Sequence, residues 1–445
     1  MSAMTVARIT RRESAFPMRQ SANDTAFQIM ASNCRFGCGI THEIGKDLVD
    51  LGARRVLIVM DPALRSLPTG AIVQQSLEES GLDFAIFDDV DVEPTDTSFM
   101  AASAFAAAGR FDAIVAVGGG STIDTAKAAN VYATHPADFL DYVNRSIGLQ
   151  HAVPGPLKPL IAIPTTAGTG SETTGVAVFD YTPLRVKTGI ASTHMRPTMG
   201  IVDWDNTRTQ PAAVAASAGL DVLSHALESF TALPYDQRLR PARPSLRAAY
   251  QGANPMSDVW ALRALEIVAA FLPRAVADTD DREARMQMML GSSMAGIGFG
   301  NAGVHLPHAM AYPVAGMVRD FRPAGYATRH PLVPHGMSVI LQTPAVARFT
   351  APTSPQRHLL AAKALGADIS HANPGDAGPI LADRVIHFMQ TLGMPRGLKD
   401  VGYSASDLSA LVDGTLAQQR LLGLSPRHAG ADELAKLFDE SMVMW

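Results

Sequence analysis

The stretch Asp112-Ala-Ile-Val-Ala-Val117 runs directly into Gly118-Gly119-Gly120-Ser121 and then into a helical pattern that carries Asp124. The apolar run is typical of a strand buried on both faces, and the glycines predict a tight strand-to-helix turn. Backbone N–H groups and the helix dipole at such a turn favour an anion, here a pyrophosphate. The stretch is neither the GxGxxG fingerprint nor a P-loop. A purely structural turn that needs small residues stays open as the alternative.

The same alternation of apolar runs and helical patterns extends from residue 55 to residue 203. It predicts strands and helices in turn, as in a parallel sheet covered by helices; the strands are expected at 55–60, 84–87, 112–117, 160–163 and 199–202, and the helices at 71–80 and 98–108. After Pro211 the periodicity is helical, over 212–230, 257–277, 282–296, 355–365, 376–392 and 405–422.

These patterns predict an α/β N-terminal dinucleotide-binding domain with a parallel sheet, followed by an all-α C-terminal domain. We expect a disordered basic tail over residues 1–24, the α/β domain over 25–207 and the helical domain, which would carry the metal and the catalytic centre, over 208–445. The long loops 231–256 and 313–334 interrupt the helical half. Long irregular connections in compact domains are often functional.

Composition narrows the function classes. The 445 residues carry a net charge of -5, which gives no general attraction to nucleic acid or to an anionic membrane. An apolar run long enough to span a bilayer is absent from the sequence. The two cysteines, Cys34 and Cys38, predict no disulfide framework and favour a reducing compartment. We therefore expect small-molecule partners; the sequence leaves the oligomeric state open, a homo-oligomer included.

Two further features suggest a bound nicotinamide dinucleotide. The segment from Pro164 to Glu172 follows an apolar strand and is dense in glycine and hydroxyl groups, among them Thr165, Thr166 and Thr169, which would line the nicotinamide and ribose. Asp61 follows the strand 55–60, where a carboxylate can bind the ribose hydroxyls and favour NAD over NADP. The alternatives are a hydroxyl-rich loop and an ordinary turn aspartate.

Four residues are candidate metal ligands. Asp221 and His225 lie four residues apart in an apolar segment and would share one helix face. His308, in an apolar setting, and His335, between a proline and a glycine, complete three imidazoles and one carboxylate. Such a set suits Fe²⁺ or Zn²⁺ better than Mg²⁺ or Ca²⁺. Spacing alone does not exclude the competing ligands His305 and His330, or a solvated aspartate beside a core histidine.

Several motifs in fixed order resemble the iron-containing, or group III, alcohol dehydrogenases. They are GGGSTIDTAK at 118–127, PTTAGTGSE at 164–172, GLDVLSHALES at 219–229, HAMAYP at 308–313 and PHG at 334–336. The resemblance covers about residues 27–445 and implies a dehydroquinate synthase-like architecture, with the metal and the nicotinamide in the cleft between two domains. Dehydroquinate synthase relatives share that fold, but the motifs here fit them poorly.

The resemblance also assigns roles to individual residues. It implies that Asp221, His225, His308 and His335 bind the metal, with Fe²⁺ expected and Zn²⁺ as the alternative. It places Gly119, Gly120, Ser121 and Asp124 at the pyrophosphate, and Thr165, Thr166, Thr169 and Lys187 around the nicotinamide. No side chain is assigned as the catalytic group, because the chemistry would be centred on the metal. Tyr312 stands where many members have a histidine, so a proton-relay role for that histidine does not transfer unchanged.

Longer matches resemble one group within this family; they cover 92–100, 139–143, 233–258, 298–318 and 330–339. They imply oxidation of 4-hydroxybutyrate to succinate semialdehyde coupled to reduction of 2-oxoglutarate to 2-hydroxyglutarate, with NAD retained. The alternative is an NAD-dependent alcohol dehydrogenase acting on 4-hydroxybutyrate or another small alcohol.

Both proposed substrates are carboxylates, and the loop 231–256 carries four arginines that could bind them; these are Arg238, Arg240, Arg243 and Arg247. A solvated basic loop is the alternative. We expect a cytoplasmic location if the chain is bacterial, because no clear presequence is evident, and a mitochondrial one if it is eukaryotic.

Overall fold

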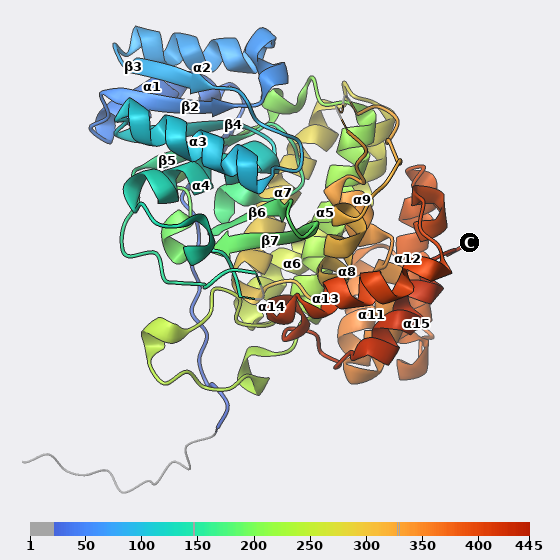
Figure 1. Ribbon diagram of the computed structural model, residues 1–445. Helices are drawn as coiled ribbons and strands as arrows, with labels where there is room; N and C mark the ends of the chain where they lie inside the picture. Colours follow the sequence, from blue (N-terminus) through green and yellow to red (C-terminus); the bar gives the residue numbers. More distant parts are fainter. Residues whose placement is uncertain (1–21, 146, 327, 329) are drawn as a thin grey trace, which may run out of the picture.

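The computed structural model describes residues 22–145, 147–326, 328 and 330–445 (Figure 1). The predicted tail over residues 1–24 lies outside the described residues up to residue 21. Its last residues are attached to the loop 231–256. Asn23 forms an antiparallel bridge with Leu239, and the Asp24 carboxylate accepts hydrogen bonds of 2.9 Å from Arg247. These last residues therefore differ from the predicted disorder.

The N-terminal half is built on a six-stranded parallel sheet with the order β1-β8-β5-β4-β2-β3. Its strands are β1 Cys34–Gly37, β2 Arg55–Met60, β3 Asp83–Phe87, β4 Ala113–Gly118, β5 Leu160–Pro164 and β8 Met199–Asp203. Every residue of β4 and β5 is buried, as their uninterrupted apolar sequences predict. The five strands predicted from the sequence are all present, with ends shifted by at most one residue.

Helices cover both faces of this sheet: α1 Ile44–Asp50, α2 Pro68–Glu79, α3 Asp96–Gly109 and α4 Gly120–Thr134. Alternate residues of β2 point to opposite sides. Ile58 packs in one cluster with Leu48 of α1 and Val73 of α2. Val59 packs in another with Ala102 of α3 and Ala126 of α4. The strand period of two residues thus divides the α/β core into two layers.

The sequence analysis did not find β1 or the antiparallel pair β6 Val176–Tyr181 and β7 Val186–Ala191. β1 is short and only partly buried, so it has no strong apolar pattern. It is held at the edge of the sheet by parallel pairing with β8. The β6–β7 pair packs on α4 and α8, beside the helical domain.

The C-terminal half is helical and forms one large core. Its helices are α5 Ala212–Thr231, α6 Pro255–Ala277, α7 Arg282–Ala302, α8 Leu306–Gly316, α9 His335–Ile340, α10 Thr343–Thr350, α11 Pro355–Ala364, α12 Ala377–Thr391, α13 Leu408–Leu416, α14 Gln419–Leu422 and α15 Ala431–Glu440. Asn254 caps α6 by accepting a 3.0 Å hydrogen bond from the backbone N–H of Ser257. In the described residues, no helix has the length and apolar character needed to cross a bilayer.

One predicted helix is wrong in extent. The segment 405–422 is divided into α13 and α14, and Gln418 lies at the break with a non-helical backbone. Its side-chain amide donates to the backbone carbonyl of Lys187 at 3.2 Å. A tertiary contact of this kind is invisible to local periodicity.

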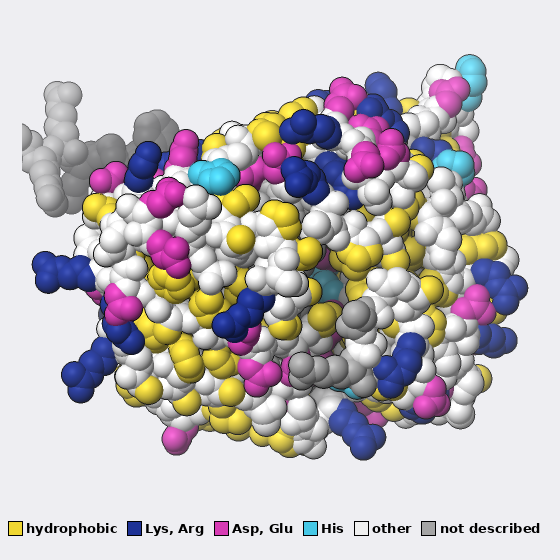
Figure 2. Space-filling model, turned by 90° about the horizontal axis from the view of Figure 1, so that it is seen from above, with side chains coloured by type: hydrophobic (Ala, Val, Ile, Leu, Met, Phe, Trp, Pro, Cys, Tyr) yellow, Lys and Arg dark blue, Asp and Glu magenta, His cyan; other side chains and the backbone are white. Residues whose placement is uncertain are grey.

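An N-terminal parallel α/β domain followed by a helical C-terminal domain is thus the fold, as predicted. The predicted boundary at residue 207 falls at the end of the 3-10 helix η6 Trp204–Thr207, between β8 and α5. Seen from above, the surface is hollowed near its middle, and a histidine side chain is visible inside the hollow (Figure 2).

Candidate metal centre and adjoining cavities

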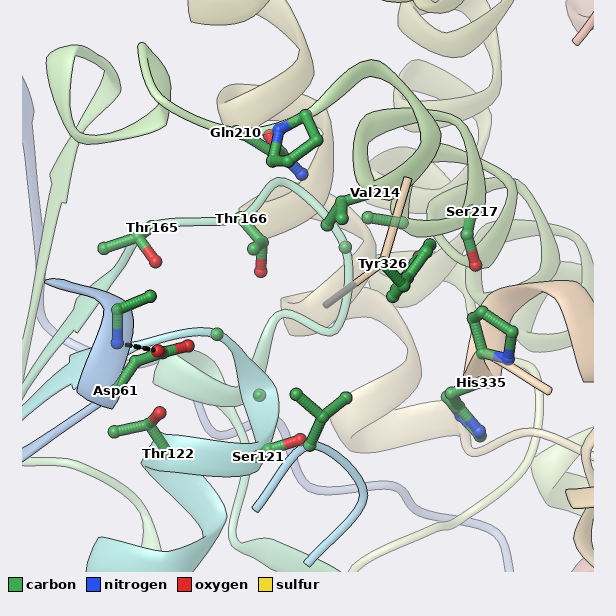
Figure 3. A pocket seen from close by; sticks show the side chains of 18 of the residues that line it. Asp61, Ser121, Thr122, Thr165, Thr166, Gln210, Val214, Ser217, Tyr326 and His335 are labelled. Carbon is green, nitrogen blue, oxygen red and sulfur yellow. Dashed lines mark hydrogen bonds between the residues drawn. The ribbon is translucent and has the colours of Figure 1, made fainter. Parts of the chain in front are cut away.

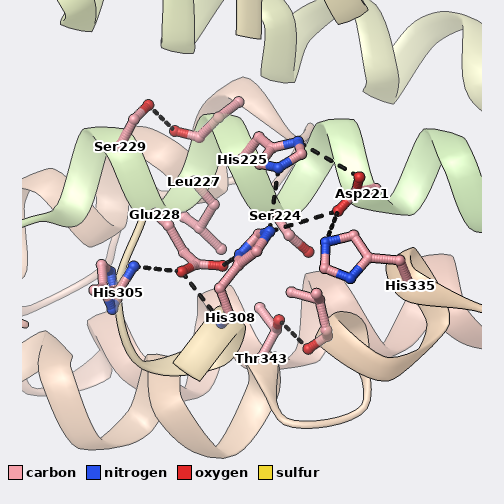
Figure 4. A network of polar contacts seen from close by, with 12 residues as sticks. Asp221, Ser224, His225, Leu227, Glu228, Ser229, His305, His308, His335 and Thr343 are labelled. Atoms are coloured by element: carbon pink, nitrogen blue, oxygen red, sulfur yellow. Dashed lines mark hydrogen bonds and ion pairs between the residues drawn. The ribbon is translucent and has the colours of Figure 1, made fainter. Parts of the chain in front are cut away.

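Helix α5 carries three buried ionisable side chains on one face. Asp221 and His225 are one turn apart, and Glu228 follows one turn later. The other faces of α5 pack on α6, α7 and α9, so this helix lies inside the domain. A helix that is buried all round normally carries apolar residues alone. The three charged groups therefore require partners, which α8 and α9 supply (Figure 4).

His308 on α8 and His335 at the start of α9 complete the cluster. The ligand atoms of Asp221, His225, His308 and His335 all lie within 4.8 Å of one another. The His308 Nε2 is 3.1 Å from the His225 Nε2 and 3.7 Å from the Asp221 Oδ1, and the His335 Nε2 is 3.9 Å from the same oxygen. These four are the residues predicted from the sequence.

Gly336 explains how His335 reaches the cluster. A Cβ at position 336 would lie 2.0 Å from the backbone oxygen of Ser217 and 2.9 Å from the Cβ of Asp221. Any side chain there would therefore push α9 away from α5. The Ser217 hydroxyl accepts a 3.1 Å hydrogen bond from the backbone N–H of Met337, which fixes the first turn of α9.

The two competing histidines lie outside the cluster. The His305 Nε2 is 3.1 Å from the Thr231 hydroxyl, and burial lowers the pKa of His305 to about 4. His330 lines a cavity nearby without joining the four ligand atoms in the described part of the chain. Spacing could not separate these residues from His308 and His335, because the choice depends on how α8 and α9 pack against α5.

Glu228 is a functional residue that the sequence analysis missed. Its carboxylate accepts a 2.6 Å hydrogen bond from the His308 Nδ1 and another of 2.6 Å from the backbone N–H of His305. Burial acts to raise the pKa of Glu228, but His308 and these hydrogen bonds hold it below its usual range. The bond to Nδ1 leaves the Nε2 of His308 facing the cluster. A glutamate one turn after His225 was the available signal.

The cluster has the chemistry of a site for a divalent cation. The Asp221 Oδ1 is buried and accepts no hydrogen bond from any described residue. Burial raises the pKa of Asp221 to about 7, so a cation among these atoms would stabilise the ionised carboxylate. Burial and the neighbouring histidines lower the pKa of His225, which keeps its ring neutral and able to coordinate. The residues present therefore fit a cation that accepts nitrogen and oxygen ligands.

A cavity of about 510 Å³ opens beside this cluster at the carboxyl edge of the sheet (Figure 3). The connections after β2 and β4 diverge there, which is where ligands bind in open α/β sheets. Seven of the nine predicted cofactor residues line it: Asp61, Gly119, Gly120, Ser121, Thr165, Thr166 and Thr169. Asp221 and His335 line the same cavity.

The geometry of the glycine turn explains its composition. β4 ends at Gly118, and α4 begins at Gly120, so the first backbone N–H groups of α4 face the cavity edge. A Cβ at Gly120 would lie 2.5 Å from the Thr169 Cγ2, which shows how closely the two predicted loops approach. Asp61 also serves as a helix cap, because its Oδ1 accepts a 2.8 Å bond from the backbone N–H of Ala63.

The structure places the remaining two predicted cofactor residues elsewhere. Asp124 accepts hydrogen bonds from the Ser171 hydroxyl at 2.5 Å and from the backbone N–H of Val178 at 2.9 Å, so its carboxylate joins α4 to β6. The Lys187 ammonium is buried, 2.7 Å from Glu93 and 2.9 Å from Asp180. Among the described residues, neither side chain lines the large cavity. Sequence could not reveal these partners, which come from distant segments.

A second cavity of about 150 Å³ adjoins the first. The two share five lining residues: Glu93, Gly120, Ser121, Thr169 and His335. His225 and His308 also line the smaller one, so the cluster lies where the two cavities meet. Phe299 of α7 stacks on the His225 ring with centroids 4.0 Å apart and forms an apolar wall there.

The loop arginines predicted to bind carboxylates do not line either cavity in the described part of the chain. Arg247 pairs with Asp24, and Arg238 donates to the backbone oxygen of Tyr250. Arg240 is exposed. The basic loop therefore holds the segment before β1 and does not face the cluster.

A nucleotide-sized cavity, a smaller cavity and a four-residue cluster of metal-ligand type between them define the class of a metal-dependent oxidoreductase. Residues 31–204 match the family described as iron-containing alcohol dehydrogenase. Residues 249–442 match the description "Fe-containing alcohol dehydrogenase family, C-terminal". The chain belongs to the iron-containing alcohol dehydrogenase family.

Individual relatives are more specific. The mitochondrial hydroxyacid-oxoacid transhydrogenase of Rattus norvegicus is 54% identical over 424 residues, which are 95% of this chain and 91% of that protein. A probable enzyme of the same name from Dictyostelium discoideum is 51% identical, over 95% of this chain and 80% of its own length.

Solved structures share the fold. A 1,3-propanediol oxidoreductase superposes with a TM-score of 0.82 and 28% identity, over 94% of this chain and all of its own. The sulfoacetaldehyde reductase of Bifidobacterium kashiwanohense in complex with NAD+ gives a TM-score of 0.75 and 26% identity, over 94% of this chain and 98% of its own.

Proposed function

We propose that this chain is a hydroxyacid-oxoacid transhydrogenase. It oxidises 4-hydroxybutyrate to succinate semialdehyde and reduces 2-oxoglutarate to 2-hydroxyglutarate, with NAD kept in place between the two half-reactions. The observation that carries the proposal is the position of the four-residue cluster at the junction of the two cavities. The identity to transhydrogenases over almost the whole chain supports this choice within the family.

The proposed roles follow from the cavities. Asp221, His225, His308 and His335 would hold a divalent cation, Fe²⁺ or Zn²⁺. The backbone at Gly119, Gly120 and Ser121 would bind the pyrophosphate of NAD, with Asp61 at the adenosine ribose and Thr165, Thr166 and Thr169 toward the nicotinamide. When bound, the cation would supply Lewis-acid polarisation of a substrate oxygen and NAD would supply hydride transfer.

Other side chains prepare the site. Glu228 orients His308 through the bond to Nδ1. Phe299 and the valines of the smaller cavity exclude water from the reacting carbon. Lys187 acts through Glu93, whose carboxylate it binds and which lines both cavities. We also propose a functional division into two domains at residue 207.

The proposal is tested by incubating the metal-loaded protein with 4-hydroxybutyrate and 2-oxoglutarate without added nucleotide. We expect succinate semialdehyde and 2-hydroxyglutarate in equal amounts, and parallel lines in initial-rate plots, because one substrate pair leaves before the other binds. An absolute requirement for added NAD, with release of one NADH for each alcohol oxidised, would instead identify an NAD-dependent alcohol dehydrogenase.

Tyr312 tests whether a protonating side chain is needed beside the cluster. It lines the smaller cavity, and burial raises its pKa to about 12, so its hydroxyl is neutral near pH 7 and acts as a hydrogen-bond donor. We expect Tyr312→Phe to lower kcat by about fivefold, the effect of one neutral hydrogen bond of about 1 kcal/mol. The pH profile of kcat between about pH 6 and 9 is expected to keep its shape, since a group with a pKa near 12 does not titrate there. Loss of one limb of that profile in the variant would contradict this role.

The compartment is also a proposal. Cys34 and Cys38 are both free thiols in the structure, which agrees with a reducing environment. We propose the cytoplasm for a bacterial source and the mitochondrion for a eukaryotic one, where the names of the animal and amoebal relatives place those proteins.

A further inference from the structure

Arg420 is the one Lys or Arg side chain among the described residues that line the smaller cavity. It belongs to the short helix α14, which packs on α8 beside His308 and Tyr312. The break at Gln418 turns α14 toward this cavity, and the Gln418 bond to the Lys187 carbonyl holds the break in place. A guanidinium is thus delivered to the cavity that the cluster also lines.

The guanidinium of Arg420 forms no ion pair with any carboxylate in the described part of the chain. Arg247, Arg319 and Arg357, by contrast, each bind an aspartate. Arg420 instead lies 4.6 Å from the ring centroid of Tyr250, a contact that orients it without neutralising its charge. Its donors therefore remain available for a carboxylate.

Two carboxylates of the chain also line this cavity, and both are matched by lysines. Glu93 is 2.7 Å from the Lys187 ammonium. Asp124 is 3.5 Å from the Lys127 ammonium and also binds Ser171. The charge that remains for an incoming anion is that of Arg420. Val176, Val178 and Val304 supply an apolar surface for a methylene chain in the same cavity.

We infer that Arg420 binds the distal carboxylate of both substrates, an inference that rests on the proposed transhydrogenase function. In 4-hydroxybutyrate the carboxylate carbon is three carbon–carbon bonds from the carbon that is oxidised. In 2-oxoglutarate the far carboxylate carbon is likewise three bonds from the keto carbon that is reduced. One fixed arginine therefore places either reacting carbon at the same point, so a single cavity serves both half-reactions.

The experiment compares substrates that differ in the distal carboxylate alone. 2-Oxopentanoate has the five-carbon chain of 2-oxoglutarate with a methyl group in place of that carboxylate. We expect Arg420→Gln to lower kcat/KM for 2-oxoglutarate by about 30-fold, mainly through KM, as expected for loss of a charge-assisted hydrogen bond pair. The value for 2-oxopentanoate should change little. Arg420→Lys keeps the charge but not the planar fork, and should restore part of the loss.

The control is Arg240→Gln, an arginine of the exposed loop that lines neither cavity in the described residues. It should leave the preference for 2-oxoglutarate over 2-oxopentanoate as it is in the unaltered protein. A second readout is calorimetric binding of glutarate to the metal-loaded protein, which should weaken in Arg420→Gln and not in Arg240→Gln.

The outcomes separate the two proposals. If Arg420→Gln and Arg420→Lys keep both the substrate preference and the affinity for glutarate, the assignment of Arg420 is overturned while the proposed function stands. If the unaltered protein turns over neither hydroxy acid nor oxo acid, the proposed function fails first. Far-UV circular dichroism and the thermal midpoint check that the variants are folded.

Discussion

Replacement of Asp221 by alanine is expected to lower kcat/KM by about 1,000-fold or more, since metal-ion stabilisation of a transition state contributes several kcal/mol and each tenfold corresponds to about 1.36 kcal/mol. Asp221 is the single carboxylate among the four clustered ligands and the one oxygen donor. Its loss removes the negative charge that would offset a divalent cation in a buried site. The measurement is the metal content of the purified protein together with kcat/KM for 4-hydroxybutyrate.

The control for this variant is Ser224→Ala in the same helix. Ser224 is buried, and its hydroxyl donates to the Leu220 backbone oxygen at 3.0 Å, so the change removes a polar group from α5 without altering the cluster. Its metal content should match that of the unaltered protein. If Asp221→Ala retains stoichiometric metal and activity, the cluster is not the site of the cation.

Replacement of Glu228 by alanine is expected to have the second largest effect. The change leaves the His308 Nδ1 and the His305 backbone N–H without their acceptor in a fully buried setting. Breaking a buried charged pair costs about 3 to 5 kcal/mol of the free energy of unfolding. Because His308 then loses its fixed orientation, the metal affinity should also fall by up to about 100-fold. Denaturant unfolding and competition with a chelator measure the two effects.

Glu228→Gln separates stability from orientation, because glutamine has the same shape and keeps one acceptor oxygen. We expect it to recover most of the stability while its metal affinity stays about 10-fold or more below that of the unaltered protein. Glu172→Gln is the matched control. Glu172 is also buried and accepts a 2.8 Å bond from Ser293, but burial raises its pKa, so a neutral replacement costs it little. Equal metal affinities in the two glutamine variants would show that Glu228 does not position His308.

Much of the fold could be predicted because its signals are local. The strand at 55–60 was assigned to the residue, since six consecutive apolar or strand-favouring residues occupy a fully buried place in the sheet. α5 was also found nearly in full, from its helical period and its position after Pro211. β1 and the division of 405–422 were missed, because pairing with β8 and the bond from Gln418 to Lys187 join residues far apart in the sequence.

The candidate site divides in the same way. The order of the motifs selected four residues whose ligand atoms the structure brings within 4.8 Å. Sequence alone kept His305 and His330 as competitors, since spacing does not record which turn of α8 faces α5. It also favoured the arginines of the loop 231–256 over Arg420, because clustering along the chain is visible and clustering in space is not.

By itself, then, the sequence determined the α/β and helical halves, the glycine turn and the identities of the candidate ligands. These depend on residue type, on apolar periodicity and on spacing within one element. The tertiary structure alone decided that Glu228 holds His308, that Asp124 and Lys187 are bound to internal partners, and that Arg420 reaches the small cavity. Each of these depends on contacts between elements that are distant along the chain, which are set by packing and hydrogen bonding in the folded protein.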